Sequence, residues 1–139
     1  MQIRQAADDD VPAICAADDT AADPKARRAL IRRSVGQGTA YVALLDGLVV
    51  GYAILEHAFF GRGFIVMLMV TPTHRRRGVA AALVRHLEGR CKSERIFTST
   101  NQSNRPMQSL LLKLGYKHSG TVEDLDPGDP ELFFSRQLK

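Results

Sequence analysis

Residues 70–80 read VTPTHRRRGVA, and this short segment joins two regular elements. The apolar run from Phe64 to Val70 before it predicts a central strand that is buried on both faces. A helix with one apolar face is predicted after it, from Val79 to about Cys91. Because a strand, a short turn and a helix aim backbone N–H groups at one point, the segment predicts a site for an anion such as a pyrophosphate.

The residues of the turn suit that prediction. Gly78 has no Cβ, so a ligand can approach the backbone there. The N–H groups of residues 76–81 are the unpaired donors of a new helix, at its positive end. Arg75, Arg76 and Arg77 add three full positive charges. A solvated basic turn is the alternative for an isolated RRRG segment, but the buried strand and the helix around it favour the anion site.

The length and the composition of the chain predict a single domain over residues 1–139. The chain has 45% hydrophobic and 24% charged residues, as ordinary globular proteins do. No run approaches the ~18 apolar residues of a membrane span, and the acidic residues Asp8 to Asp10 follow too soon for a signal peptide. We therefore expect a cytoplasmic location and no membrane partner. Cys15 and Cys91 lie far apart without a CxxC motif, which indicates free buried thiols.

The element order predicts an α+β fold. Strands are expected at residues 2–5, 39–45, 48–56, 64–70, 96–100, 116–123 and 132–138. A first helix is expected after Asp8 as its N-cap, with Val11, Ile14 and Ala17 on its apolar face. Further helices are expected from 24 to about 35, at 79–91 and at 106–114, with a polar linker at 16–22 and a loop at 57–63. This order gives a central, mostly antiparallel sheet. One parallel step joins strands 64–70 and 96–100 through helix 79–91, as a right-handed crossover.

Two motifs in this order resemble a known family. The segments V-x-P (residues 70–72) and R-x-x-G-x-A (75–80) resemble the acetyl-CoA-binding motif R/Q-x-x-G-x-G/A of the GCN5-related N-acetyltransferases, or GNAT family. Further on, N-x-x-M (104–107) and L-G-Y (114–116) resemble the family's N-x-x-A and L-G-F. The resemblance implies the GNAT fold: about seven strands, mostly antiparallel with one parallel splayed pair, flanked by four helices.

The resemblance also implies which residues bind acetyl-CoA. The strand before the turn would offer backbone groups to the pantetheine, the turn amides would hold the pyrophosphate, and Asn104 would touch the pantetheine. The implied cofactor-binding residues are Leu68, Met69, Val70, Arg75, Arg76, Arg77, Gly78, Val79, Ala80, Ala81 and Asn104. The thioester would lie in the gap of the splayed pair. No metal is expected.

The implied reaction is direct transfer of an acetyl group from acetyl-CoA to a primary amine. A typical amine is protonated at pH 7, so a general base must make it neutral before it attacks. Many family members carry a tyrosine as general acid seven residues after the asparagine, where this chain has Leu111. Members that acetylate protein N-termini carry a glutamate that would fall at Ser99. The nearest hydroxyl groups are those of Ser99, Ser103, Ser109 and Tyr116.

Glu56, at the end of the predicted strand 48–56, is the preferred candidate for the base, and His57 is the second choice. The plainer alternatives are a solvated strand-end charge for Glu56 and a loop histidine for His57. Phe59 and Phe60 either wall an acceptor pocket or close the edge of the core. Two further features could contact a cationic amine or be ordinary polar surface: Asn101, and the acidic group Asp124, Asp126, Asp129 and Glu131.

Three functions remain open at this level. The favoured one is an N-acetyltransferase for a small-molecule or peptide amine. An acyl-CoA-binding module with little or no catalysis is the alternative that Leu111 suggests. A nucleic-acid binder would explain the net charge of +4, but no aromatic platform or recognised motif accompanies the arginines, so we expect no nucleic acid. The identity of the amine stays open, as does the choice between monomer and homodimer.

Overall fold

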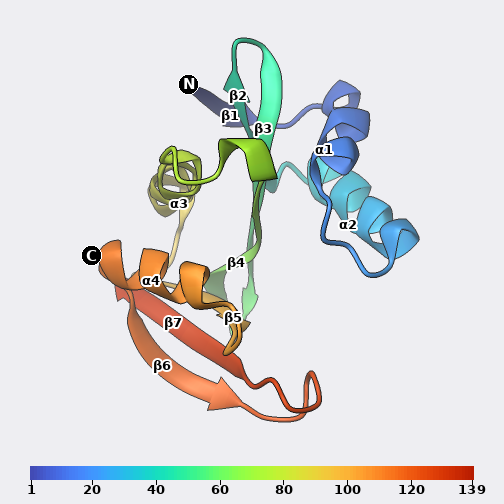
Figure 1. The fold of residues 1–139 in the computed structure, drawn as a ribbon. Coiled ribbons are helices and arrows are strands. Elements are labelled where there is room, and N and C mark those ends of the chain that lie inside the picture. Colours follow the sequence, from blue (N-terminus) through green and yellow to red (C-terminus); the bar gives the residue numbers. More distant parts are fainter. The chain divides into compact units, whose positions relative to one another are not determined.

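The computed structural model describes all residues from 1 to 139 (Figure 1). Its four helices are α1 (Val11–Ala17), α2 (Pro24–Gly36), α3 (Val79–Arg90) and α4 (Arg105–Lys113). Its strands are β1 (Gln2–Gln5), β2 (Ala40–Leu45), β3 (Leu48–Phe59), β4 (Arg62–Val70), β5 (Arg95–Asn101), β6 (Lys117–Val122) and β7 (Glu131–Gln137). Short 3-10 turns lie at Asp8–Asp10 and Pro72–His74. Asp8 therefore begins a 3-10 turn and is not the N-cap of α1, which is Asp10. The predicted order of helices and strands is confirmed.

The seven strands form one mixed sheet in the order β1-β2-β3-β4-β5-β7-β6. The pairs β1–β2, β2–β3, β5–β7 and β6–β7 are antiparallel. The pair β4–β5 is parallel, with Gly63 opposite Ile96 and Ile65 opposite Thr98. The prediction of a mostly antiparallel sheet with one parallel pair is therefore confirmed.

The predicted loop at 57–63 is wrong. β3 continues to Phe59 and β4 begins at Arg62, so only Phe60 and Gly61 form the turn. Both turn residues have positive φ, 52° for Phe60 and 78° for Gly61, as a tight two-residue hairpin requires. Phe-Gly lacks the usual Asn-Gly signal, which explains the error. Glu56 consequently lies within a strand and not at its end.

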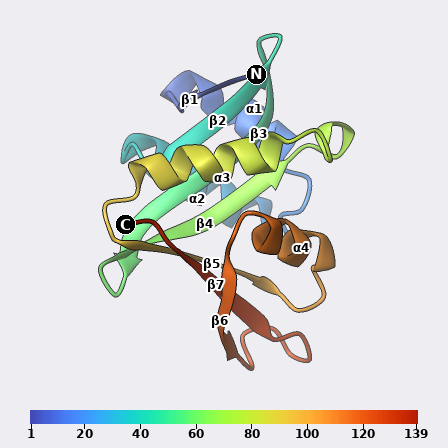
Figure 2. The same ribbon diagram turned by 90° about the vertical axis from the view of Figure 1, so that its left-hand side faces the viewer.

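The chain divides into two compact units, the first comprising Met1–Leu55 and Met67–Gly89. In this unit α1 and α2 cover one face of the strands and α3 covers the other (Figures 1 and 2). Ile14, Ile31, Tyr52 and Leu83 are fully buried between these layers. Gly51 allows close packing against β4 and α3, because a Cβ there would lie 2.8 Å from the Met69 carbonyl oxygen and 3.2 Å from the Val79 side chain.

The second unit comprises Glu56–Val66 and Arg90–Lys139. Here α4 lies along one face of β5, β6 and β7, as both ribbon views show. Leu111 of α4 is only 1% exposed. A side-chain hydrogen bond also joins the parallel strands β5 and β4: the Thr98 hydroxyl donates to the Ile65 carbonyl at 3.0 Å.

Both cysteines are free, as predicted, but only Cys91 is buried, whereas Cys15 is half-exposed. None of the four helices combines the length and the apolar character that crossing a membrane requires.

Candidate acetyl-CoA site and catalytic residues

The turn between β4 and α3 has an unusual backbone. Arg76 and Gly78 both adopt left-handed conformations, with φ of 64° and 82°. The Ala82 N–H donates to the Gly78 carbonyl at 3.0 Å as the helix begins. The N–H groups of residues 79–81 therefore precede the first intrahelical bond and have no acceptor within the helix. A Cβ on Gly78 would meet nothing within 4 Å, so the space beside this glycine is open.

Side chains and strand ends hold this turn in place. The Thr71 N–H donates to the Val50 carbonyl of β3 at 2.9 Å. The His74 ring nitrogen Nδ1 lies 3.0 Å from the hydroxyls of both Thr71 and Thr73. These bonds hold the segment that leads from β4 into the turn.

The three arginines differ in their surroundings. Arg75 Nε donates to the Val70 carbonyl at 3.0 Å, and its Nη2 forms an ion pair with Asp19 at 3.5 Å. Arg76 and Arg77 are exposed. Arg75 thus helps to shape the turn, while the other two offer their charges to solvent or a ligand. Sequence reasoning missed Asp19, since nothing local links a connection after α1 to residue 75.

The predicted pantetheine contacts lie on the strand and on α4. Leu68 and Met69 are half-buried in β4, and Val70 is buried. Asn104, in the second unit, is the N-cap of α4, and its Oδ1 accepts the Met107 N–H at 3.3 Å. This bond occupies the side-chain oxygen and leaves the NH₂ group of Asn104 for a ligand.

The two candidate bases have different environments. Glu56 is half-buried within β3. His57 Nε2 accepts the backbone N–H of Lys92 at 2.9 Å, so this nitrogen has a structural partner. Burial, and then the charge of Lys92, lower the pKa of His57 below its ordinary value. His57 is therefore the weaker candidate, which leaves Glu56 as the preferred residue of the pair.

The hydroxyl groups considered as acids are mostly occupied. Tyr116 is 2% exposed. The Ser99 hydroxyl donates to Glu131 at 2.7 Å, and the Ser103 hydroxyl donates to Asp129 at 2.6 Å. Only Ser109 is exposed without such a bond. Leu111 is a core residue, so its position offers hydrocarbon and no proton donor.

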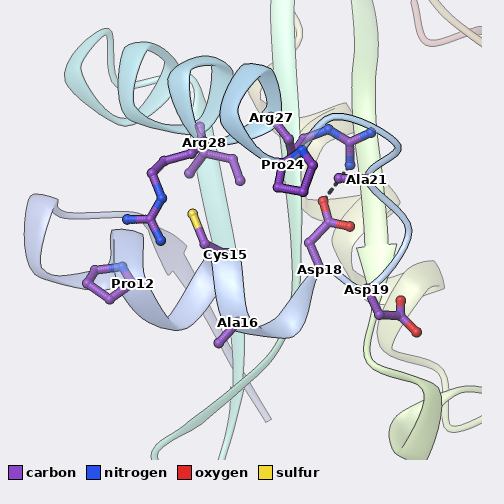
Figure 3. Close-up of a pocket in the computed structure, with 10 residues that line it drawn as sticks. Pro12, Cys15, Ala16, Asp18, Asp19, Ala21, Pro24, Arg27 and Arg28 are labelled. Atoms are coloured by element: carbon purple, nitrogen blue, oxygen red, sulfur yellow. Dashed lines mark hydrogen bonds and ion pairs between the residues drawn. The ribbon is translucent and has the colours of Figure 1, made fainter.

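A separate hollow of about 370 Å³ lies between α1 and α2 (Figure 3). Its lining is Pro12, Cys15, Ala16, Asp18, Asp19, Ala21, Pro24, Arg27, Arg28 and Ile31. Residues 16–22, which were expected to form a polar linker, thus contain a buried carboxylate, that of Asp18. The side chain of Asp18 is only 1% exposed, and its Oδ2 accepts bonds from the Tyr52 hydroxyl at 2.6 Å and from Arg27 at 2.5 Å.

Burial opposes ionisation of Asp18, but the hydrogen bonds from Tyr52, Thr20 and Arg27 outweigh it and hold the pKa of this carboxyl below its usual value. The charge is therefore retained inside the first unit. The bonds join α1, α2 and β3, which gives Asp18 a structural part in that unit.

A mixed seven-stranded sheet with an open, left-handed turn at a helix N-terminus defines an α+β protein equipped to bind a polyanion. A family model described as "Acetyltransferase (GNAT) family" matches residues 3–116. The chain therefore belongs to the GNAT family of acetyltransferases, as its motifs predicted.

Individual relatives agree with this assignment. An acetyltransferase of the GNAT family from Bacillus cereus is 34% identical, with a TM-score of 0.92 over 98% of this chain and 96% of that one. A Salmonella typhimurium protein, solved with its cofactor acetyl-CoA, has the same fold, with 21% identity and a TM-score of 0.79 over 100% of this chain and 94% of that one.

A curated relative is the mycothiol acetyltransferase of Thermomonospora curvata, which is 36% identical over 69 residues. That match covers 50% of this chain and 23% of the relative's length.

Proposed function

We propose that residues 1–139 act as one N-acetyltransferase domain, which transfers an acetyl group from acetyl-CoA directly to a primary amine. The observation that carries the proposal is the turn at Gly78, where an open left-handed backbone precedes the unpaired N–H groups of α3. A diphosphate is a fitting ligand for such a turn, because its charge and acceptor oxygens match the donors and the helix dipole. Family membership supports acetyl-CoA as the source of that diphosphate.

The proposed chemistry requires no covalent enzyme intermediate. The neutral amine attacks the thioester carbonyl, a C–N bond forms, the C–S bond breaks, and CoA leaves as the thiol after gaining the proton that the amine loses. A backbone N–H of β4 would stabilise the carbonyl oxygen as it gains charge. This step depends on the predicted splay between β4 and β5, which places the thioester. Glu56 is the proposed base, acting directly or through a water molecule.

The same proposal makes the acceptor of the acetyl group a small-molecule or peptide amine. The Thermomonospora relative is named a mycothiol acetyltransferase, but the match covers only 23% of its length. The runner-up is an acyl-CoA-binding module with little or no catalysis. It is favoured by buried Leu111 at the position of the usual acid and by the occupied hydroxyls of Ser99 and Ser103.

A panel of amines tests the proposal. Release of CoA is followed with a polyamine, an amino sugar, amino acids and peptides, and binding of acetyl-CoA is measured separately by calorimetry. The enzyme should bind acetyl-CoA and release CoA only in the presence of certain amines. Tight binding without turnover on any amine would instead establish the binding module, and no binding would remove both.

Glu56→Gln tests the base. If Glu56 removes the proton, the variant should lose about 10²–10⁴-fold in kcat/KM and lose the acidic limb of the pH–rate profile. Glu94→Gln is the matched control, an exposed glutamate before β5. An unchanged pH–rate profile in Glu56→Gln would exclude Glu56 as the base.

A further inference from the structure

The second unit carries an aromatic cluster that the proposed chemistry does not use. Five of the six phenylalanines meet there, and we call them the phenylalanine face: Phe59, Phe60, Phe64, Phe97 and Phe133. The ring centroid of Phe59 lies 4.8 Å from that of Phe64 and 5.2 Å from that of Phe97. Its ring is nearly parallel to that of Phe133, at 5.8 Å and 17°.

This cluster lies on the side of the sheet away from α4. Arg136 approaches Gly115 at the end of α4, and Arg136 is opposite Ile96 in the β5–β7 ladder. Because side chains alternate along a strand, Phe97 and Phe133 point to the other face. That face is partly open to solvent: its strand phenylalanines are half-buried and Phe60 is 80% exposed. A contiguous apolar patch of this kind marks a surface that binds a partner.

A carboxylate is fixed beside the phenylalanine face. Glu131 shares a strand and a face with Phe133, two residues away, and is opposite Asn101. Its Oε2 accepts the Ser99 hydroxyl at 2.7 Å, so the carboxylate is held against the sheet. Glu131 is the last residue of the segment 123–131, which reads EDLDPGDPE and contains five acidic residues and no basic one.

The acidic connection is itself held in place. Asn101 Nδ2 donates to Asp126 at 2.9 Å, and Ser103 donates to both oxygens of Asp129, through its N–H at 3.0 Å and its hydroxyl at 2.6 Å. The second unit thus presents two adjoining surfaces of different chemistry, one aromatic and one negative. A partner that matches both must combine apolar groups with several positive charges.

We propose that this surface binds the acceptor, and that the acceptor is the amine of a basic peptide with an apolar side chain near it. The inference rests on the proposed acetyl transfer. The apolar side chain would cover the phenylalanine face, and the peptide's positive charges would lie along Glu131 and residues 123–129. The five carboxylates are spread over nine residues, so they match positive charges that are distributed along a peptide. A single ammonium group would need only one carboxylate. An open face also fits an extended chain better than a small ligand, which requires a concave pocket.

Peptide binding to the full-length protein tests this inference independently of turnover. Three peptides of equal length are labelled at the C-terminus and compared by fluorescence anisotropy: a basic one with phenylalanine, the same peptide with serine in that place, and an acidic one with phenylalanine. The basic phenylalanine peptide should bind at least tenfold more tightly than the other two. Its affinity should fall as salt is added, because the charge contribution is screened.

Two substitutions locate the binding surface. Phe60→Ser removes an exposed ring, and Glu131→Gln removes the charge but keeps an acceptor for Ser99. Each should weaken binding of the basic phenylalanine peptide about tenfold and raise the KM for its acetylation. Matched controls are Leu112→Ser, an apolar residue on α4 that is 60% exposed, and Glu94→Gln. Both controls should bind the peptide as the unchanged protein does.

The outcomes separate the two proposals. Equal affinity for all three peptides, or wild-type affinity in both Phe60→Ser and Glu131→Gln, would overturn this inference even if ethanolamine and other small amines are acetylated. Selective peptide binding without acetylation of any amine would leave the docking surface standing and remove the acetyltransferase activity.

Discussion

Gly78 meets two separate requirements at one position. Its φ of 82° lies in the region that other residues enter at a cost, and the space beside it is empty of protein atoms. An added Cβ would therefore meet no protein atom within 4 Å but would enter the space of the proposed ligand. This distinction makes the glycine a useful probe, because folding and binding respond differently to what replaces it.

Gly78→Glu and Gly78→Ala form a matched pair. Both should lower the free energy of unfolding by a similar amount, about 1–2 kcal/mol, because both place a Cβ at positive φ. Only the glutamate adds a negative charge at the helix N-terminus, so it should weaken acetyl-CoA binding at least a hundredfold, and the alanine far less. Calorimetry and denaturant titration measure the two effects. If the glutamate variant binds as tightly as the alanine variant, the turn does not hold the pyrophosphate.

Tyr52 is the second residue whose role the structure defines. Its hydroxyl donates to buried Asp18 at 2.6 Å, and the burial and this bond raise its pKa. Tyr52→Phe should cost about 1.5–3 kcal/mol of stability, the range for a hydrogen bond to a charged group. Tyr41→Phe, on neighbouring β2, is the control, because Tyr41 packs on His86 and is outside the Asp18 network. If urea titrations show the same loss of unfolding free energy in both variants, the hydrogen bond from Tyr52 to Asp18 contributes no stability of its own.

Among the elements, the β3–β4 hairpin depends on a contact distant in sequence. The N–H of Lys92, in the connection after α3, donates to His57 on β3, and the Gly63 N–H of β4 donates to the Ser93 hydroxyl at 2.9 Å. The hairpin and the connection are thereby joined at both strands. A proton on His57 Nε2 would remove the acceptor that Lys92 uses.

This contact predicts a pH dependence. The pKa of His57 is lower in the folded protein than the value of about 6.5 in an unfolded chain. The unfolded state therefore binds more protons as the pH falls, and the stability that neutral His57 contributes is complete above pH ~6.5 and is lost as the pH falls through the folded pKa. His57→Gln keeps an acceptor that does not titrate. Denaturation between pH 7.5 and 5 should show a steeper loss in the unchanged protein than in this variant, and parallel curves would contradict the prediction.

At the scale of the whole molecule, β3 and β4 each pass from one compact unit to the other. β3 crosses between Leu55 and Glu56, and β4 crosses between Val66 and Met67. Two continuous strands common to both units favour cooperative unfolding, which the proposed single domain requires.

We therefore expect one thermal transition for residues 1–139, with calorimetric and van't Hoff enthalpies that agree. Acetyl-CoA at 100 times its dissociation constant should add about 2.7 kcal/mol and move the whole transition to a higher Tm. CoA without the acetyl group is a suitable comparison, because it carries the same diphosphate. Two transitions, of which the ligand shifts only one, would show that the units unfold separately.

The strand, turn and helix around Gly78 were largely predictable from the sequence because their signals are local. An apolar strand, a glycine and an apolar-faced helix follow one another within about 30 residues, so periodicity and turn chemistry were sufficient. The failures also have local causes. The hairpin turn at Phe60-Gly61 lacks the usual composition, and the buried carboxylate of Asp18 lies in a segment whose neighbours are small and polar.

By itself, the sequence determined the order of elements, the mixed sheet and the segment expected to bind a diphosphate, because each depends on neighbours along the chain. Only the tertiary structure decided that Asp18 is held by Tyr52, that His57 is an acceptor for Lys92, and that Ser99 holds Glu131 beside the phenylalanine face. These partners are between 32 and 35 residues apart in sequence, and strand pairing and helix packing bring them together.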